Sequence, residues 1–292
     1  MQKLEENIVK EISSQIENYM PHLKTVSTGK IIKIGDGIAT IDNLSSAAVG
    51  EVLEFPKGIK GMALNLRKGE VGAIIFGDYS LFKEGDEVLS TGKILSISVS
   101  PSLLGRVVNP MIEAIDGGSP LNFGKEVREM LIEKIAPGIV YREPVNAPLQ
   151  TGIKSVDSMT PIGRGQRELI IGDRNTGKTA IAIDTIINQA KENRSKVAKR
   201  VISIYVAIGQ KQSKIAQVVS KLEEMDAMDA TIVVSAGSAD PVAYQYIAPY
   251  SGCAIAEYFM EKGEDVLIVY DDLSKHAWAY RQISLILRRP SG

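Results

Sequence analysis

The chain has few of the residue types that build specialised covalent or metal sites. It contains one cysteine, Cys253, which excludes an internal disulfide, and two histidines, His22 and His276, so a structural zinc site is not expected. Cys253 lies in a stretch with helical character, where we expect a small, buried and unreactive thiol. The net charge of −1 provides no basic excess to attract a phosphate backbone, so nucleic-acid binding is not expected as the main role.

Long hydrophobic runs are also missing. No apolar run approaches the roughly 20 residues that a membrane helix needs. The first twenty residues carry several acidic side chains, which argues against a signal or transit peptide. The 292 residues are 44 % hydrophobic and 24 % charged, as in soluble globular proteins with room for two cores. We therefore expect a protein of a cytoplasm-like compartment, or one that reaches a membrane surface through partners.

The sequence pattern predicts three regions, at residues 1–26, 27–93 and 94–292. The first carries an apolar stripe at helical spacing that Pro21 ends. This amphipathic helix could pack on the protein's own body or dock a partner. In the second region, short β-rich runs alternate with turn signals, and Asp36-Gly37 in "IGDGI" is a tight hairpin signal. We expect a small all-β barrel there.

In the third region, β-rich apolar runs alternate with helical stretches. The runs lie at residues 168–172, 201–208, 231–235 and 266–270. Continuous apolar strands separated by helices indicate an α/β fold, a parallel sheet with helices on both faces.

The stretch "GDRNTGKT" matches the phosphate-binding loop pattern Gly-x-x-x-x-Gly-Lys-Thr. The run at 168–172 predicts a strand before it, and "TAIAIDTII" predicts a helix after it. In that arrangement, loop N–H groups and the helix N-terminus face the phosphates. Gly172 and Gly177 permit the backbone turn, Lys178 would reach the β- and γ-phosphates, and Thr179 would offer its hydroxyl to Mg²⁺.

Two downstream residues are expected at the same site. Asp271 directly follows the run at 266–270, where a carboxylate can serve the Mg²⁺, while Asp272 or Ser274 suits the capping of the next helix. Gln210 ends the strand that follows the loop helix, a position where many ATPases of this architecture have glutamate. Glutamine can hydrogen-bond a water but cannot take its proton, so general-base assistance is absent. Alternatively, Gln210 is merely a polar residue at a strand end.

Long segments of the chain carry a family resemblance. The runs "PLQTGIKSVDSMTPIGRGQRELIIGDRNTGKTAIAIDTIINQ", "YVAIGQKQSKIAQVV" and "YDDLSKHAWAYRQISLILRRPSG" are similar to the alpha subunits of F-type ATP synthases. The likeness extends from about Ile12 to Gly292 and implies a RecA-like P-loop domain after the barrel. It also implies a metal site at Thr179 and Asp271. The implied nucleotide contacts are Gly172, Asp173, Arg174, Asn175, Thr176, Gly177, Lys178, Thr179, Ala180 and Gln210.

The resemblance implies a function within a complex. In this family, alpha and beta subunits alternate in a hexamer around a gamma-type central stalk, and the beta subunits carry the catalytic sites. Alpha binds ATP or ADP with Mg²⁺ without turning it over, and its N-terminal helix would dock a delta-type subunit. The whole complex is a translocase that makes ATP from ADP and phosphate with a proton gradient. These relations imply a peripheral position on the cytoplasmic face of a bacterial cell membrane, or the equivalent face in an organelle, with the membrane reached only through the complex.

Some features depart from the family pattern. Asn175 stands where glutamine is usual, and His276 and Trp278 replace a glutamine and a small aliphatic residue. The chain stops at "RRPSG" inside the family's nucleotide domain, so we expect an open sheet edge and an uncovered core face.

Two other functions stay open from the sequence. An autonomous hexameric ATPase motor, of the terminator helicase or secretion ATPase type, would share "PIG-x-GQR" but is expected to have glutamate at position 210. A truncated relic would only bind partners through residues 1–20.

Overall fold

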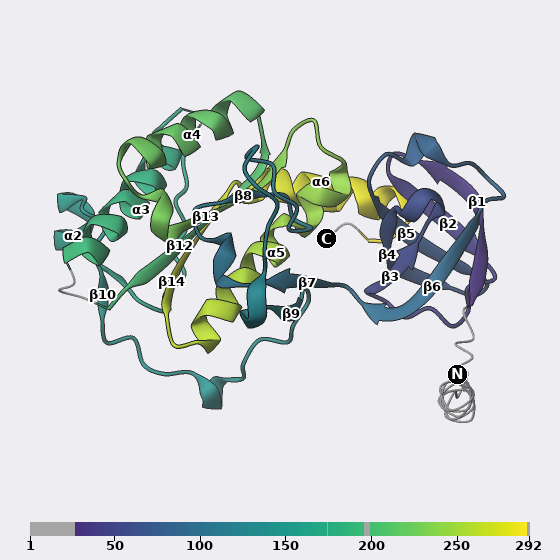
Figure 1. Cartoon of the computed structure of the whole chain (residues 1–292), viewed down its shortest axis with the longest axis horizontal. Helices are drawn as coiled ribbons and strands as arrows, with labels where there is room; N and C mark the ends of the chain where they lie inside the picture. Colours follow the sequence, from purple (N-terminus) through teal and green to yellow (C-terminus); the bar gives the residue numbers. More distant parts are fainter. Residues whose placement is uncertain (1–26, 174, 196–198, 291–292) are drawn as a thin grey trace, which may run out of the picture.

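The computed structural model describes residues 27–173, 175–195 and 199–290 of the chain, and the predicted helix at 1–26 lies outside them. A β-barrel and a larger α/β body lie side by side (Figure 1). They are linked by the path from strand β6 (Glu87–Ile94) to strand β7 (Ser96–Val99) and by the last helix, α6 (Leu273–Ile286). None of the helices in the described part of the chain is long and apolar enough to cross a lipid bilayer.

The barrel confirms the prediction of a small all-β barrel ahead of the α/β region. Its strands close in the order β1-β2-β5-β4-β3-β6. Asp36 and Gly37, which join the first two strands, both have positive φ, 52° and 75°, as a two-residue type I′ hairpin turn requires. The strands are β1 Thr28–Gly35, β2 Ile38–Asp42, β3 Glu51–Glu54, β4 Lys60–Arg67, β5 Glu70–Phe76 and β6 Glu87–Ile94.

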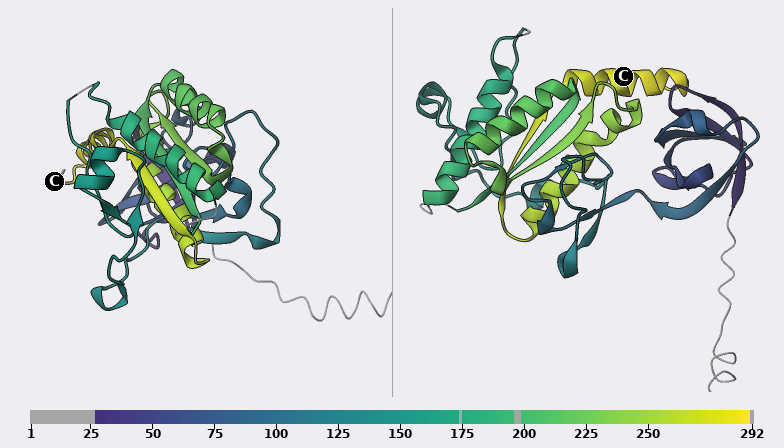
Figure 2. Two further views of the ribbon diagram at one scale, coloured as in Figure 1. Left: turned by 90° about the vertical axis from the view of Figure 1, so that its left-hand side faces the viewer. Right: turned by 45° about the horizontal axis from the view of Figure 1, so that its top comes forward.

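The α/β body is built on a parallel sheet with the order β14-β12-β13-β8. Its strands are β8 Val107–Val108, β12 Val201–Gln210, β13 Thr231–Gly237 and β14 Asp265–Asp271, and its helices are α3 Lys178–Ser195, α4 Gln212–Glu224, α5 Val242–Glu261 and α6 Leu273–Ile286. α3 and α4 pack on one face of the sheet, and α5 and α6 pack on the other (Figure 2). Every residue of β12 is buried, which explains its mostly apolar sequence. The predicted layer arrangement is confirmed.

The segment between the barrel and α3 is less regular than the predicted alternation. Residues 95–150 contain no α-helix, and the only α-helix before α3 in the described part is the short α2 Lys154–Met159. The remaining strands are β7 Ser96–Val99, β9 Arg128–Leu131, β10 Pro148–Leu149 and β11 Ile162–Gly163, and 3₁₀ turns lie at Pro56–Gly58, Tyr79–Leu81, Pro101–Leu103, Gly124–Glu126, Ile139–Tyr141 and Met228–Ala230. β7 pairs with β9 and β10 with β11, both antiparallel.

Two expectations from the sequence are wrong. Residues 168–172 do not form a strand, and the side chains of Leu169 and Ile171 are 73 % and 84 % exposed. No strand in the described chain pairs with this segment, and β propensity alone does not hold a strand without a partner. Cys253 is exposed rather than buried. As expected, the sheet has an open edge: β14 lies there, and its residues are only half-buried.

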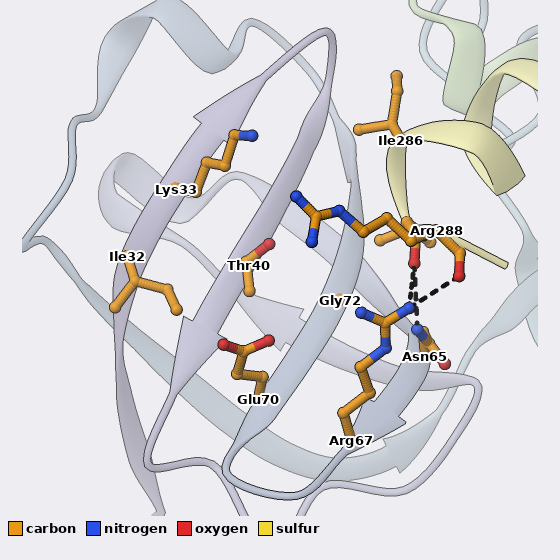
Figure 3. Close-up of a pocket in the computed structure, with 10 residues that line it drawn as sticks. Ile32, Lys33, Thr40, Asn65, Arg67, Glu70, Gly72, Ile286 and Arg288 are labelled. Carbon is orange, nitrogen blue, oxygen red and sulfur yellow. Dashed lines mark hydrogen bonds between the residues drawn. The ribbon is translucent and has the colours of Figure 1, made fainter.

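The C-terminal end of α6 rests on the barrel (Figure 3). The Arg67 guanidinium donates hydrogen bonds to the carbonyl oxygens of Leu287, at 2.9 Å, and Arg288, at 2.8 Å. Carbonyl groups at a helix end lack partners within the helix, so the guanidinium satisfies them and complements the negative end of the helix dipole. Gly72 on β5 lies so close to Leu287 that a Cβ there would be 2.5 Å from its Cδ2 atom. α6 therefore connects the barrel to the carboxyl edge of the sheet.

Candidate functional site

The predicted phosphate loop lies at the carboxyl edge of the sheet, directly before α3. Because α3 begins at Lys178, the first N–H groups of this helix have no partner within it and can face an anion. Gly177 adopts φ 88°, which favours glycine, and Asn175 adopts φ 61°, a region in which asparagine is enriched. Arg174 lies outside the described residues.

The loop lysine is folded over its own loop. The Lys178 ammonium donates to the carbonyl oxygen of Gly172 at 2.6 Å and also to that of Asp173, while the Thr176 hydroxyl donates to the Asp173 carbonyl at 2.8 Å. These carbonyls are neutral, so they leave the positive charge of Lys178 uncompensated. Because a phosphate oxygen carries a negative charge and a carbonyl oxygen does not, a phosphate would be a better partner for this ammonium.

Asp271 is the centre of a hydrogen-bonded cluster at the end of β14. The Thr179 hydroxyl donates to its Oδ2 atom at 2.8 Å, and the Gln210 amide donates to its Oδ1 atom at 3.1 Å. The structure therefore brings together the three predicted residues Thr179, Gln210 and Asp271, from α3, β12 and β14. Parallel pairing of β12 with β14, which sets Ala207 opposite Asp271, places these groups at one edge.

Tyr205 is a member of this cluster that the sequence analysis missed. Its hydroxyl donates to Asp271 Oδ2 at 2.7 Å. Burial, and next the negative charge of Asp271, raise the pKa of Tyr205 well above its usual value, so the hydroxyl stays protonated and remains a donor. The available signal was a tyrosine within a mostly apolar buried strand, since a buried tyrosine hydroxyl usually has a partner.

Two lysines complete the site, and the sequence analysis missed both. The Lys214 ammonium lies 3.3 Å from Thr179 Oγ1 and 3.3 Å from Gln210 Oε1. The Lys275 ammonium donates to the Gly209 carbonyl oxygen at 2.8 Å and lies 3.4 Å from Gln210 Oε1. Both lysines occupy the first turns of their helices, α4 and α6, where the helix dipole disfavours a positive charge. The signal available in the sequence was that each lysine lies at the start of a predicted helix that directly follows a predicted strand.

These contacts orient the Gln210 side chain. Its Nε2 atom donates to the Asp271 carboxylate and backbone oxygen, and its Oε1 atom accepts from two ammonium groups. The network defines which end of the amide is oxygen. The oxygen that could orient a water is already engaged by Lys214 and Lys275.

The donors present fit a magnesium ion. A hydroxyl and a carboxylate are the hard oxygen ligands that Mg²⁺ prefers, and Thr179 and Asp271 meet at 2.8 Å. Among the residues that the structure describes, no group of three or more His, Cys, Asp or Glu side chains could hold a metal ion. A Mg²⁺ ion here would therefore depend on phosphate oxygens and water for its other ligands, as in P-loop sites.

The fold and the loop geometry define a P-loop nucleotide-binding α/β domain that follows a β-barrel. Residues 152–292 match the nucleotide-binding domain of the ATP synthase alpha/beta family, and residues 25–92 match the beta-barrel domain of that family. The chain belongs to the ATP synthase alpha/beta family.

Several curated relatives are similar over nearly the whole of this chain. The ATP synthase subunit alpha of Dehalococcoides mccartyi is 55 % identical over 287 residues, which is 98 % of this chain and 55 % of the relative. The subunits alpha of Clostridium acetobutylicum and Methylobacillus flagellatus are 56 % identical over 287 residues and 54 % identical over 281 residues. The match to the Clostridium acetobutylicum subunit includes 98 % of this chain and 55 % of that relative. The match to the Methylobacillus flagellatus subunit includes 96 % of this chain and 53 % of that relative. The chain thus spans about half the length of these relatives, and the predicted likeness to alpha subunits is confirmed.

Proposed function

We propose that this chain acts as a non-catalytic, nucleotide-binding alpha subunit of a rotary ATP synthase, which makes ATP from ADP and phosphate with a proton gradient. The observation that carries the proposal is the meeting of Thr179, Gln210 and Asp271 at the N-terminus of α3. The names of the relatives support the same role, and they do not favour an autonomous motor.

The chain's own groups would hold the nucleotide as follows. The first N–H groups of α3 and the loop N–H groups bind phosphate oxygens, and the Lys178 ammonium moves from the loop carbonyls to the β- and γ-phosphates. Thr179 and Asp271 would hold Mg²⁺, which when bound neutralises charge on the phosphates. Tyr205 keeps the Asp271 carboxylate in position through its hydroxyl.

The same geometry supports binding without hydrolysis. Attack on the γ-phosphate needs a group that orients or deprotonates water, and general-base assistance typically contributes about 10²–10⁴-fold. Gln210 cannot take a proton, and its oxygen accepts from Lys214 and Lys275. We infer that nucleotide stays intact at this site.

We further propose the assembly that the relatives' names suggest. Beta subunits would alternate with this subunit in a hexamer around a gamma-type stalk, and residues 1–26 would dock a delta-type subunit. The complex would lie on the cytoplasmic face of a bacterial membrane or the equivalent organellar face.

Single-turnover hydrolysis by the purified chain with Mg-ATP tests the proposal. We expect ATP binding that Lys178→Ala abolishes, with hydrolysis no faster than slow, unassisted turnover. Gln210→Glu restores a carboxylate and is expected to raise the rate if position 210 faces the γ-phosphate. Hydrolysis of several turnovers per second by the parent, lost in Lys178→Ala, would contradict the non-catalytic role and favour the autonomous motor.

A further inference from the structure

The ammonium group of Lys214 lies at the place where the candidate metal ligands meet. Its Nζ atom is 3.3 Å from Thr179 Oγ1 and 3.9 Å from Asp271 Oδ2. The Thr179 hydroxyl donates its proton to Asp271, so its oxygen lone pairs are free to accept from Lys214. A cation therefore already sits against the same two oxygen donors that would hold Mg²⁺.

The position of Lys214 is not explained by packing. Its side chain is 44 % exposed and lies in the first turn of α4, next to the positive end of the helix dipole. The neighbouring apolar residues Ile215 and Val218 bury the helix against the sheet without it. The contacts that favour its charge are those with Thr179, Gln210 and Asp271.

We propose that Lys214 is a built-in cation that replaces part of the role of Mg²⁺ in nucleotide binding. This inference rests on the proposed function, because it concerns how the same site neutralises a bound polyphosphate. The flexible four-carbon stem of lysine lets the ammonium move from Asp271 to a phosphate oxygen. The site then holds nucleotide with a reduced dependence on Mg²⁺, and Lys214 and Mg²⁺ compete for the same two oxygen atoms, Thr179 Oγ1 and Asp271 Oδ2.

The test is the dissociation constant of ATP, measured by titration calorimetry in excess EDTA and again in excess MgCl₂. The variants are Lys214→Met, which removes the charge, and Lys214→Arg, which keeps it. Lys221→Met is the matched control, since Lys221 lies on the same helix and forms an ion pair with Glu224 at 3.0 Å. Lys178→Ala reports on the nucleotide site itself.

We expect the parent's dissociation constant for ATP in EDTA to be at most about tenfold higher than in MgCl₂. A tenfold difference corresponds to about 1.4 kcal/mol. Lys214→Met should increase this EDTA-to-MgCl₂ ratio by about tenfold or more, chiefly through weaker binding in EDTA. Lys214→Arg and Lys221→Met should leave the ratio close to that of the parent.

The outcomes separate this inference from the proposed function. An unchanged ratio in Lys214→Met, with ATP binding that still requires Lys178, overturns the role of Lys214 and leaves the proposed function standing. Absence of ATP binding by the parent in both buffers overturns both. The melting temperature of Lys214→Met shows whether this variant is folded. An EDTA-to-MgCl₂ ratio that also increases about tenfold in Lys214→Arg overturns the role of the charge.

Discussion

Thr179 and Asp271 are separated by 92 positions in the chain, and the hydroxyl of the first donates to the carboxylate of the second at 2.8 Å. This hydrogen bond joins the start of α3 to the end of β14. Each side chain holds the other in one orientation, so the loop and the acidic residue form a single structural unit before any ligand arrives. Changes at one of the two residues are therefore expected to act on both.

The first prediction concerns the charge of Asp271. Asp271→Asn keeps an oxygen that can accept from Thr179 but removes the charge that favours Mg²⁺. We expect ATP binding in MgCl₂ to weaken about tenfold, corresponding to about 1.4 kcal/mol. Binding in EDTA should stay equal or become tighter, because a negative charge near the triphosphate is gone. Calorimetry in the two buffers measures both affinities, and Asp229→Asn, at an exposed aspartate, is the control. The same Mg²⁺ dependence in Asp271→Asn and the parent would contradict the metal assignment.

The second prediction concerns the hydroxyl of Tyr205. Tyr205→Phe keeps the buried ring and removes the donor that lies 2.7 Å from Asp271. Hydrogen bonds to charged groups contribute about 1.5–3 kcal/mol, so the free energy of unfolding should fall by about that amount. Urea denaturation measures the change. Tyr79→Phe, at an exposed tyrosine, should stay within about 0.5 kcal/mol of the parent, and an equally small effect at Tyr205 would refute the prediction.

The third prediction concerns the contact between α6 and the barrel. A Cβ on Gly72 would lie 2.5 Å from Leu287 Cδ2, whereas a Cβ on Gly35 has nothing within 4 Å. Overpacking typically costs about 1–3 kcal/mol, so Gly72→Ala should reduce the free energy of unfolding by that amount, and Gly35→Ala should not.

The pair can be isolated with a double variant. Leu287→Ala removes the atom that the new methyl group meets, so Gly72→Ala should cost less in the Leu287→Ala background than in the parent. Equal costs in both backgrounds would show that the destabilisation does not arise at this contact.

The fourth prediction concerns pH. His276 stacks on Tyr246 at 6.0 Å between ring centroids, meets the edge of Tyr250 at 5.8 Å, and lies 3.0 Å from the Tyr246 carbonyl oxygen through Nε2. Burial lowers the pKa of His276 below its usual value of 6.5. The neutral ring is thus favoured by folding, and this contribution is complete above pH 6.5 and is lost as the pH falls through the folded pKa.

Urea denaturation at pH 7.5 and pH 5.5 measures this loss, both values being chosen to lie about one unit on either side of the unfolded pKa. His276→Gln should show a smaller decrease in stability between the two pH values than the parent. The same pH dependence in His276→Gln and the parent would exclude His276 as its source.

The sequence by itself determined the main elements of the fold and the contiguous part of the site. The hairpin at Asp36-Gly37 follows from local backbone preferences, and β12 is recognisable because a strand buried on both faces is mostly apolar. The phosphate loop is recognisable because its residues are consecutive. Gln210 and Asp271 could be placed because parallel strands bring their carboxyl ends to one edge.

Only the tertiary structure decided which other side chains reach that edge. The sequence places Lys214 and Lys275 near predicted helix starts, but their convergence on Gln210 depends on where α4 and α6 begin in space. Tyr205 meets Asp271 through the register of β12 and β14. The segment at 168–172 shows the converse: its residues have strand propensity, but a strand needs a paired neighbour, and no local pattern contains that information.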